Sequence, residues 1–147
     1  MAAMVLATGG CRGLSGKPRV AIRGTTWTVD LATTPEQRYQ GLSGRGDLPE
    51  GTGMLFVYPS AQVLEFCMRG CRIPLDIAFI GPDMRVVRTH TMAIDADPLR
   101  PAAYGSFLPA QFAMEAPAGS LRRAGVRVGD EVAFSGVPEP AKAMPDP

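Results

Sequence analysis

Long apolar runs and an excess of charge are both missing from this chain of 147 residues. A helix that crosses a membrane needs about 20 consecutive apolar residues, and no run comes near that length, so we expect no transmembrane span. The formal net charge is only +1, and no basic stretch has aromatic residues between its cations. Proteins that bind nucleic acid usually carry such a basic footprint, so we expect no nucleic-acid partner.

Histidine is scarce as well, because the chain has only one. A nucleophilic cysteine needs a base beside it, so any cysteine–histidine dyad would have to use His90. Together with Cys67 and Cys71, this histidine falls short of the four ligands of a structural zinc site. We therefore predict no metal and no cofactor. These residues name no reaction, and we favour a protein that is not an enzyme.

Turn-forming residues, in contrast, are abundant, with 17 glycines and 14 prolines. Such a composition favours many short strands and turns over a helical bundle. The hydrophobic fraction of 46% and the charged fraction of 20% are those of an ordinary globular domain.

Alternating β-branched residues predict a β-hairpin of residues 19–23 and 26–31. Strands at hairpin spacing imply a curled, mainly antiparallel sheet, and closing it into a barrel removes exposed edges. We therefore predict a mostly β fold with two short helices (α+β), arranged as a small, partly open antiparallel β-barrel. Further strands are expected at residues 53–58 (ended by Pro59), 63–68, 75–80, 85–92, 107–115 and 131–134, with a short second helix at 121–124.

The first helix is predicted from a capping pattern that begins at Thr34. Thr34 can cap the helix and Gln37 can complete a capping box, while Gly41 ends it. We expect Tyr39 and Leu42 to pack inward from this helix and the residue after it.

The chain divides into three parts by composition. Residues 1–17 form either a disordered leader or the remnant of an export signal, and the second reading would place a lipid anchor on Cys11. Residues 18–135 form a single β-barrel domain. Residues 136–147, which are rich in proline and have no apolar period, form a disordered tail.

Asp76 interrupts an apolar strand at residues 75–80. An unpaired carboxylate in apolar surroundings is costly, so Asp76 must face solvent or meet a partner, for which Arg45, Arg69 and Arg72 are the candidates. Such a pair can be purely structural. It can also belong to a polar cleft whose arginines bind a carboxylate or a phosphate.

Cys67 and Cys71 are separated by three residues, and three readings stay open. They can be inert, half-buried thiols. They can form a disulfide if the residues between them make a turn. They can also serve metal or redox chemistry, with Met68 or His90 as a further ligand.

Several stretches of the chain resemble one known family. Residues 29–45, the Gly-Met-Leu-Phe of 53–56, and residues 66–79 with their Pro-Leu-Asp resemble three motifs of domain-of-unknown-function family 192, an uncharacterised ancient conserved region. The resemblance covers about residues 20–134. We expect Glu115 and the Gly129–Asp130 pair to serve the barrel rim and its turns. The C-terminal matches to the family are Glu115, Gly119, Gly125, Gly129 and Asp130.

The resemblance implies a compact, β-rich bacterial or archaeal protein, often with an export signal, for which no activity is established. Cys67 stands where the family usually has tryptophan, and Cys71 where it has threonine. Two cysteines at these nearby positions favour a disulfide, and therefore export. The resemblance points to these matched positions: Arg38, Arg45, Met68, Arg69, Pro74 and Asp76.

The leading hypothesis is a monomeric binding module for a small anionic molecule or peptide, in the bacterial periplasm or envelope rather than the cytoplasm. One alternative is a thiol, redox or metal-binding protein that uses Cys67, Cys71 and His90. Another is a structural or assembly partner without a small-molecule site. The residues predicted to bind the ligand are Arg38, Arg45, Cys67, Met68, Arg69 and Asp76.

Overall fold

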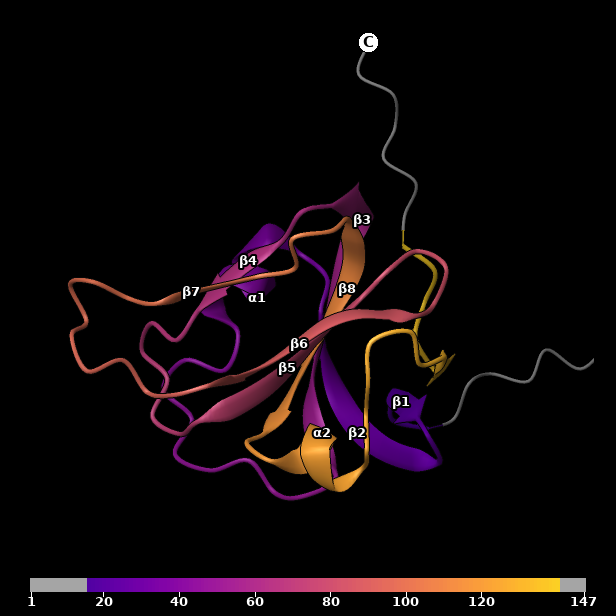
Figure 1. The fold of residues 1–147 in the computed structure, drawn as a ribbon, viewed down its shortest axis with the longest axis horizontal. Helices are drawn as coiled ribbons and strands as arrows, with labels where there is room; N and C mark the ends of the chain where they lie inside the picture. The colour runs from indigo at the N-terminus through magenta and orange to yellow at the C-terminus, as the bar shows by residue number, and fades with distance from the viewer. Residues whose placement is uncertain (1–15, 141–147) are drawn as a thin grey trace, which may run out of the picture.

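The computed structural model describes residues 16–140, so the N-terminal stretch with Cys11 and residues 141–147 of the predicted tail lie outside the described residues. The described chain is mostly β with two short helices, as predicted (Figure 1). Its elements are β1 (Arg19–Ile22), β2 (Thr25–Ala32), α1 (Pro35–Gln40), β3 (Thr52–Gln62), β4 (Glu65–Cys67), β5 (Leu75–Ile80), β6 (Val86–Met92), β7 (Ala103–Gly105), β8 (Ala110–Pro117), α2 (Ser120–Arg123) and β9 (Val132–Ser135).

Seven strands form one curled sheet in the order β6-β5-β8-β3-β2-β1-β9, and β4 pairs with β7 in a small second sheet. The predicted hairpin is present, with Val20 of β1 opposite Trp27 of β2. The next pair departs from the antiparallel prediction, because β2 and β3 run parallel, with Leu31 opposite Leu55. Parallel neighbours need a long crossover, and residues 33–51, which include α1, supply it.

The two edge strands of the curled sheet meet at one point. An antiparallel bridge joins Arg85 to Glu131, and the same two side chains form an ion pair of 2.9 Å. Beside the bridge, the Val132 amide donates a hydrogen bond to the Met84 carbonyl at 2.9 Å. The sheet is therefore a half-barrel whose two edges meet over a short stretch, residues 84–86 against 129–132, in agreement with the predicted partly open barrel.

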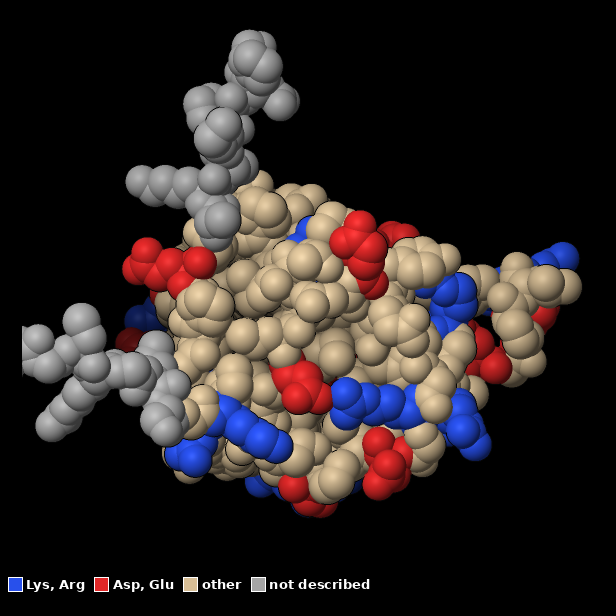
Figure 2. All heavy atoms as spheres, turned by 180° about the vertical axis from the view of Figure 1, so that it is seen from behind, with Lys and Arg blue, Asp and Glu red and all other residues tan. Residues whose placement is uncertain are grey.

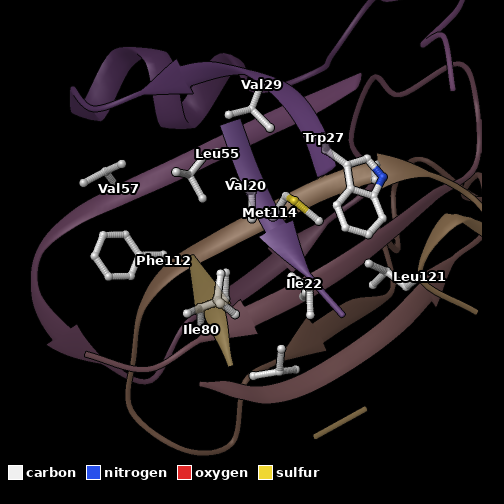
Figure 3. Packing of buried hydrophobic residues seen from close by; sticks show 14 residues of the cluster. Val20, Ile22, Trp27, Val29, Leu55, Val57, Ile80, Phe112, Met114 and Leu121 are labelled. Carbon is white, nitrogen blue, oxygen red and sulfur yellow. The ribbon is translucent and has the colours of Figure 1, made fainter. Parts of the chain in front are cut away.

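The inner side of the curl holds one hydrophobic core (Figure 3). Trp27 is buried there, and α2 packs against β5 and β8, which brings Leu121 into the same cluster. The buried members of this core are Val20, Ile22, Trp27, Val29, Leu55, Val57, Ala78, Ile80, Val86, Phe112, Met114, Ala116, Leu121 and Val132.

The outer face of the sheet is covered as well, by the β4–β7 ribbon and the loop after α1. Leu42 and Phe56 belong to this second core. Phe66 of β4 stacks edge-on against Phe56 and Phe79, with ring centroids 4.9 and 5.6 Å apart. Consequently β5 is buried on both faces, and all six of its residues, including Asp76, are buried. Any acidic side chain in this double-covered region needs a physical explanation.

Helix α1 forms as the capping pattern predicts. The Thr34 hydroxyl accepts a hydrogen bond from the Gln37 amide, and the Gln37 side chain accepts one from the Thr34 amide, both at 3.2 Å. Leu42 is buried as expected. The predicted inward packing of Tyr39 is wrong, because its ring lies outside the core under the Arg69 guanidinium and is 71% exposed.

Two strand predictions also need correction. β3 does not end at Pro59 but continues to Gln62, after an irregularity in its pairing with β8. Proline is tolerated at such a bulge because the ladder of hydrogen bonds is interrupted there. The strand β7 (Ala103–Gly105) has no counterpart among the predicted strands. Three residues are too few to show an alternating pattern, and β7 exists only through its pairing with β4.

Candidate functional site

One acid lies in the middle of the double-covered part of the sheet. Glu115 belongs to β8, opposite Met54 of β3 and Ile77 of β5, and it is only 4% exposed. The expectation that Glu115 serves the barrel rim is therefore wrong. The sequence signal is an acid inside the apolar stretch Phe-Ala-Met-Glu-Ala at residues 112–116, and the reasoning applied to Asp76 applies equally to it.

No hydrogen bond or ion pair joins the carboxyl group of Glu115 to another residue within 16–140, and its oxygens are not completely shut off from the pocket space. Burial raises its pKa from 4.5 to about 8. Burial acts in this direction because the charged form loses its hydration while the neutral form loses little. At neutral pH Glu115 is therefore mainly a neutral acid, which can both donate and accept a hydrogen bond.

Glu115 lines a small pocket on the outer side of the sheet, with a volume of about 40 Å³. A cavity for one water needs roughly 10–15 Å³, so this pocket has room for a group of about three heavy atoms. The side chains around it combine aromatic rings, thiols and guanidinium groups. The residues that matter most for its chemistry are Arg38, Phe56, Phe66, Cys67, Arg69, Cys71 and Glu115.

A tight turn forms one wall of the pocket. The Cys71 amide donates a hydrogen bond to the Met68 carbonyl at 3.0 Å, and Gly70 adopts a positive φ of 68°. The loop after α1 holds the turn in place, because the Ser43 hydroxyl donates to the Arg69 carbonyl at 2.9 Å. Met68 is a buried core residue and anchors the turn, so it does not offer its thioether to a ligand.

Both cysteines of this turn line the pocket as free, half-buried thiols. Burial raises the pKa of the Cys71 thiol to about 11, and the nearby Glu115, Cys67 and Asp95 add to the rise while Arg69 opposes it. Cys71 is therefore protonated at neutral pH and is not a ready nucleophile.

The two arginines at the pocket differ in how far they are already engaged. Arg38 donates hydrogen bonds to the backbone carbonyls of Thr33 and Val57, at 2.7 and 2.9 Å, so it ties α1 to β3. Arg69 stacks on the Tyr39 ring, with its guanidinium carbon 4.1 Å from the ring centroid, and makes only a long 3.4 Å hydrogen bond to the Tyr39 carbonyl. Arg69 is therefore the arginine with more capacity left to bind a ligand.

Asp76 is not part of this pocket. Its carboxylate faces α2, where it accepts hydrogen bonds from the Thr91 hydroxyl at 2.7 Å and from the Leu121 amide at 3.0 Å. A partner for Asp76 was expected, but an arginine was the wrong choice. The predicted partner Arg45 instead forms an exposed ion pair of 2.8 Å with Asp30.

His90 does not line the pocket of the two cysteines. Its Nε2 atom lies 2.8 Å from the Gly105 carbonyl oxygen, and its ring packs edge-on near Phe79 and Tyr104. Among residues 16–140, no three histidine, cysteine or acidic side chains are arranged to hold a metal ion. No helix in this part of the chain is long and apolar enough to cross a membrane.

The structure thus defines a class: a single curled β-sheet domain with a buried acid under a short covering ribbon. Comparison with family models gives the particular family. The chain belongs to DUF192, described as an uncharacterized ACR, whose model matches residues 18–134. This confirms the resemblance seen in the sequence motifs.

Solved structures show the same fold. A protein of Sinorhizobium meliloti 1021, described as a proposed transcription regulator, is 31% identical over 83% of this chain and 96% of its own, with a TM-score of 0.74. A protein of unknown function from Novosphingobium aromaticivorans DSM 12444 is 27% identical over 85% of this chain and 99% of its own, with a TM-score of 0.71. No curated protein sequence matches the chain.

Proposed function

We propose that this protein is a binding module whose ligand inserts a carboxylate group into the Glu115 pocket. The observation that carries the proposal is the Glu115 carboxyl group, which is buried, unpartnered within residues 16–140 and open to a cavity. An unpaired polar group is costly to bury, and a ligand that completes its hydrogen bond recovers that cost.

The chemistry of the pocket favours a carboxylate over other small groups. A neutral Glu115 can donate its proton in a hydrogen bond to an anionic oxygen, and such charge-assisted bonds are stronger than neutral ones. Arg69 supplies the positive charge at the rim. The volume of about 40 Å³ suits a group of three heavy atoms, so the rest of the ligand would lie outside, as in a peptide with a free C-terminus.

Matched probes can test the proposal by isothermal titration calorimetry. The probes are acetate, a short peptide with a free C-terminal carboxylate and the same peptide as its C-terminal amide. We expect the acid to bind and the amide to bind at least tenfold more weakly, because it lacks the charge that Arg69 and Glu115 recognise.

Three variants locate the binding. Glu115→Ala and Arg69→Ala should each weaken the acid peptide about tenfold or more, since each removes a charge-assisted hydrogen bond. Arg45→Ala removes an exposed arginine that pairs with Asp30 outside the pocket, and it should leave the affinity as it is. Equal binding of acid and amide, or equal loss in all three variants, would count against the carboxylate pocket.

The description of the Sinorhizobium protein as a transcription regulator does not extend readily to this chain. In residues 16–140 the helices have six and four residues, whereas a recognition helix must reach along a DNA groove. The net charge is +1, and Figure 2 shows acidic and basic side chains interspersed on one face. The small-ligand proposal fits these features better than direct DNA binding.

A further inference from the structure

The two pocket cysteines stand on either side of one short turn. The hydrogen bond from the Cys71 amide to the Met68 carbonyl, at 3.0 Å, closes a turn of residues 68–71, which brings the Cα atoms of Met68 and Cys71 within about 7 Å of each other. Cys67 directly precedes the turn as the last residue of β4. Both cysteines line the same pocket, and Cys67 is among the neighbours that raise the Cys71 pKa, so the two side chains lie near each other, as a disulfide requires.

The turn is fixed independently of the two sulfur atoms. The Ser43 hydroxyl and the Gly44 amide donate to the carbonyls of Arg69 and Gly70, at 2.9 and 2.8 Å. Met68 is held in the core below. The contacts that hold this turn therefore do not involve either sulfur atom.

We propose that Cys67 and Cys71 form a reversible disulfide across this turn, and that the bond gives the Glu115 pocket a second, oxidised state. The bond would close a loop of only a few residues. Short loops gain least from cross-linking, so this disulfide is expected to be a reducible one rather than a permanent staple.

A low-molecular-weight disulfide, such as oxidised glutathione, is a sufficient oxidant. The Cys67 thiolate attacks one of its sulfurs, a mixed disulfide forms, and one glutathione thiolate leaves. Cys71 then loses its proton to solvent and attacks the Cys67 sulfur, which releases the second glutathione. Two protein thiols become one disulfide, and the oxidant is reduced by two electrons to two thiols. Burial and the neighbouring acids oppose ionisation of Cys71, so Cys67 takes the first step.

The consequence for the pocket follows from where the sulfur atoms lie. In the reduced state the wall beside Glu115 carries two separate thiols, whereas in the oxidised state it carries one rigid bridge. A change in the shape and polarity of this wall alters the surroundings of the Glu115 carboxyl group. Control of ligand binding by this bond rests on the function proposed above, but formation of the bond does not.

The test uses the full chain with Cys11→Ser, because that third cysteine would confuse the thiol count. The protein is equilibrated in mixtures of reduced and oxidised glutathione, blocked with N-ethylmaleimide, and examined by intact mass and peptide mapping. We expect an oxidised form that is lighter by two hydrogens, carries no maleimide, joins Cys67 to Cys71 in one peptide and returns to the dithiol with excess reductant. Cys67→Ser and Cys71→Ser should each abolish this form.

Two results would overturn the proposal at this stage. One is labelling of both cysteines at every glutathione ratio. The other is a stable mixed disulfide with glutathione on one cysteine only.

Coupling to the pocket is read from the ¹³C resonance of the Glu115 carboxyl group, assigned with Glu115→Gln. Oxidation should change the chemical shift of this resonance and the pH at which it titrates, whether or not any ligand is known. A disulfide that leaves the resonance in place would refute the second state of the pocket. Failure of the acid peptide to bind either form would instead count against the proposed function, while the disulfide would stand.

Discussion

The backbones of Gly53 and Glu115 touch across the β3–β8 pair. A Cβ atom at position 53 would lie 2.2 Å from the Glu115 carbonyl oxygen, which is closer than two such atoms can approach. Glycine at position 53 is therefore what lets β3 reach β8 beside the buried acid. The position of Glu115 thus depends on a glycine that does not itself line the pocket.

Gly53→Ala should lower the free energy of unfolding by about 1–3 kcal/mol, because the strands must move apart to admit the methyl group. Urea denaturation with matched slopes measures the loss. Gly46→Ala is the control, since a Cβ there meets only Arg72 at 3.8 Å. A Gly53→Ala protein as stable as the Gly46→Ala protein would mean that the strands are not in contact.

The buried Glu115 should make stability depend on pH. Its pKa is about 8 in the folded protein and near 4.5 when unfolded, so the folded state holds the proton more tightly. This tighter proton binding stabilises the folded state. The stabilisation is fully present below about pH 4.5 and is lost as the pH rises to about 8, and this loss lowers the free energy of unfolding by about 5 kcal/mol at most over that range.

Glu115→Gln cannot ionise and should lack this dependence. The difference in unfolding free energy between wild type and Glu115→Gln, followed from about pH 4.5 to about pH 9, isolates the contribution of this group from all others. We expect wild type to lose stability relative to the variant across this range. A flat difference would show that the carboxyl group is ionised throughout, which the account does not allow.

Asp76 should matter for stability and not for ligand binding. Asp76→Ala leaves the Leu121 amide and the Thr91 hydroxyl without their acceptor, and we expect a loss of about 2–5 kcal/mol. Thr91→Val should cost about 1 kcal/mol, and the double variant less than the sum, because the two share one hydrogen bond. Additive losses would show that Thr91 and Asp76 do not share a hydrogen bond. Arg45→Ala is the control, because it breaks only an exposed ion pair and should lower the free energy of unfolding by about 0.5 kcal/mol or less.

The two pocket arginines, Arg38 and Arg69, should differ in how much each contributes to stability. Arg38→Ala removes two hydrogen bonds to backbone carbonyls and should lower the unfolding free energy by about 1.5–3 kcal/mol. Arg38→Lys should recover only part of this loss, because both hydrogen bonds come from the terminal Nη1 atom, which the shorter lysine side chain does not place at the same point, and because the stacking of the guanidinium on Tyr58 is lost. Arg69→Ala should change stability by about 0.5 kcal/mol or less. Thermal denaturation of the three variants checks this order, and a larger loss for Arg69 would assign it a structural role.

The fold was largely predictable because its local signals agree with one another. The capping box of Thr34 and Gln37 and the alternation around Trp27 give the same answer in sequence and structure. The parallel pairing of β2 with β3 was not predictable, because it depends on how residues 33–51 cross the sheet. β7 was missed because it is defined by its partner β4 rather than by its own residues.

The site was harder to predict, because it is assembled by tertiary contacts. Cys67, Arg69 and Arg38 do line one pocket, whereas Arg45 and Asp76 lie elsewhere. Sequence position suggested an arginine for Asp76, but a hydroxyl and a backbone amide satisfy it. The apolar stretch around Glu115 marks an acid in a buried strand, but the sequence does not say which face of that strand a second layer covers, and this coverage places Glu115 beside the cysteines and Arg69.

The affinity of the C-terminal acid peptide as a function of pH, from about pH 6.5 to about pH 9.5, distinguishes a neutral Glu115 that donates a hydrogen bond to the ligand from an ionised Glu115 that cannot. If a neutral Glu115 donates a hydrogen bond to the ligand carboxylate, the affinity of wild type should fall about tenfold for each pH step of about one above the Glu115 pKa. In Glu115→Gln, where the side chain is neutral at every pH, the affinity should not follow this fall. An affinity that rises with pH in wild type, or that falls equally in both proteins, would contradict the account.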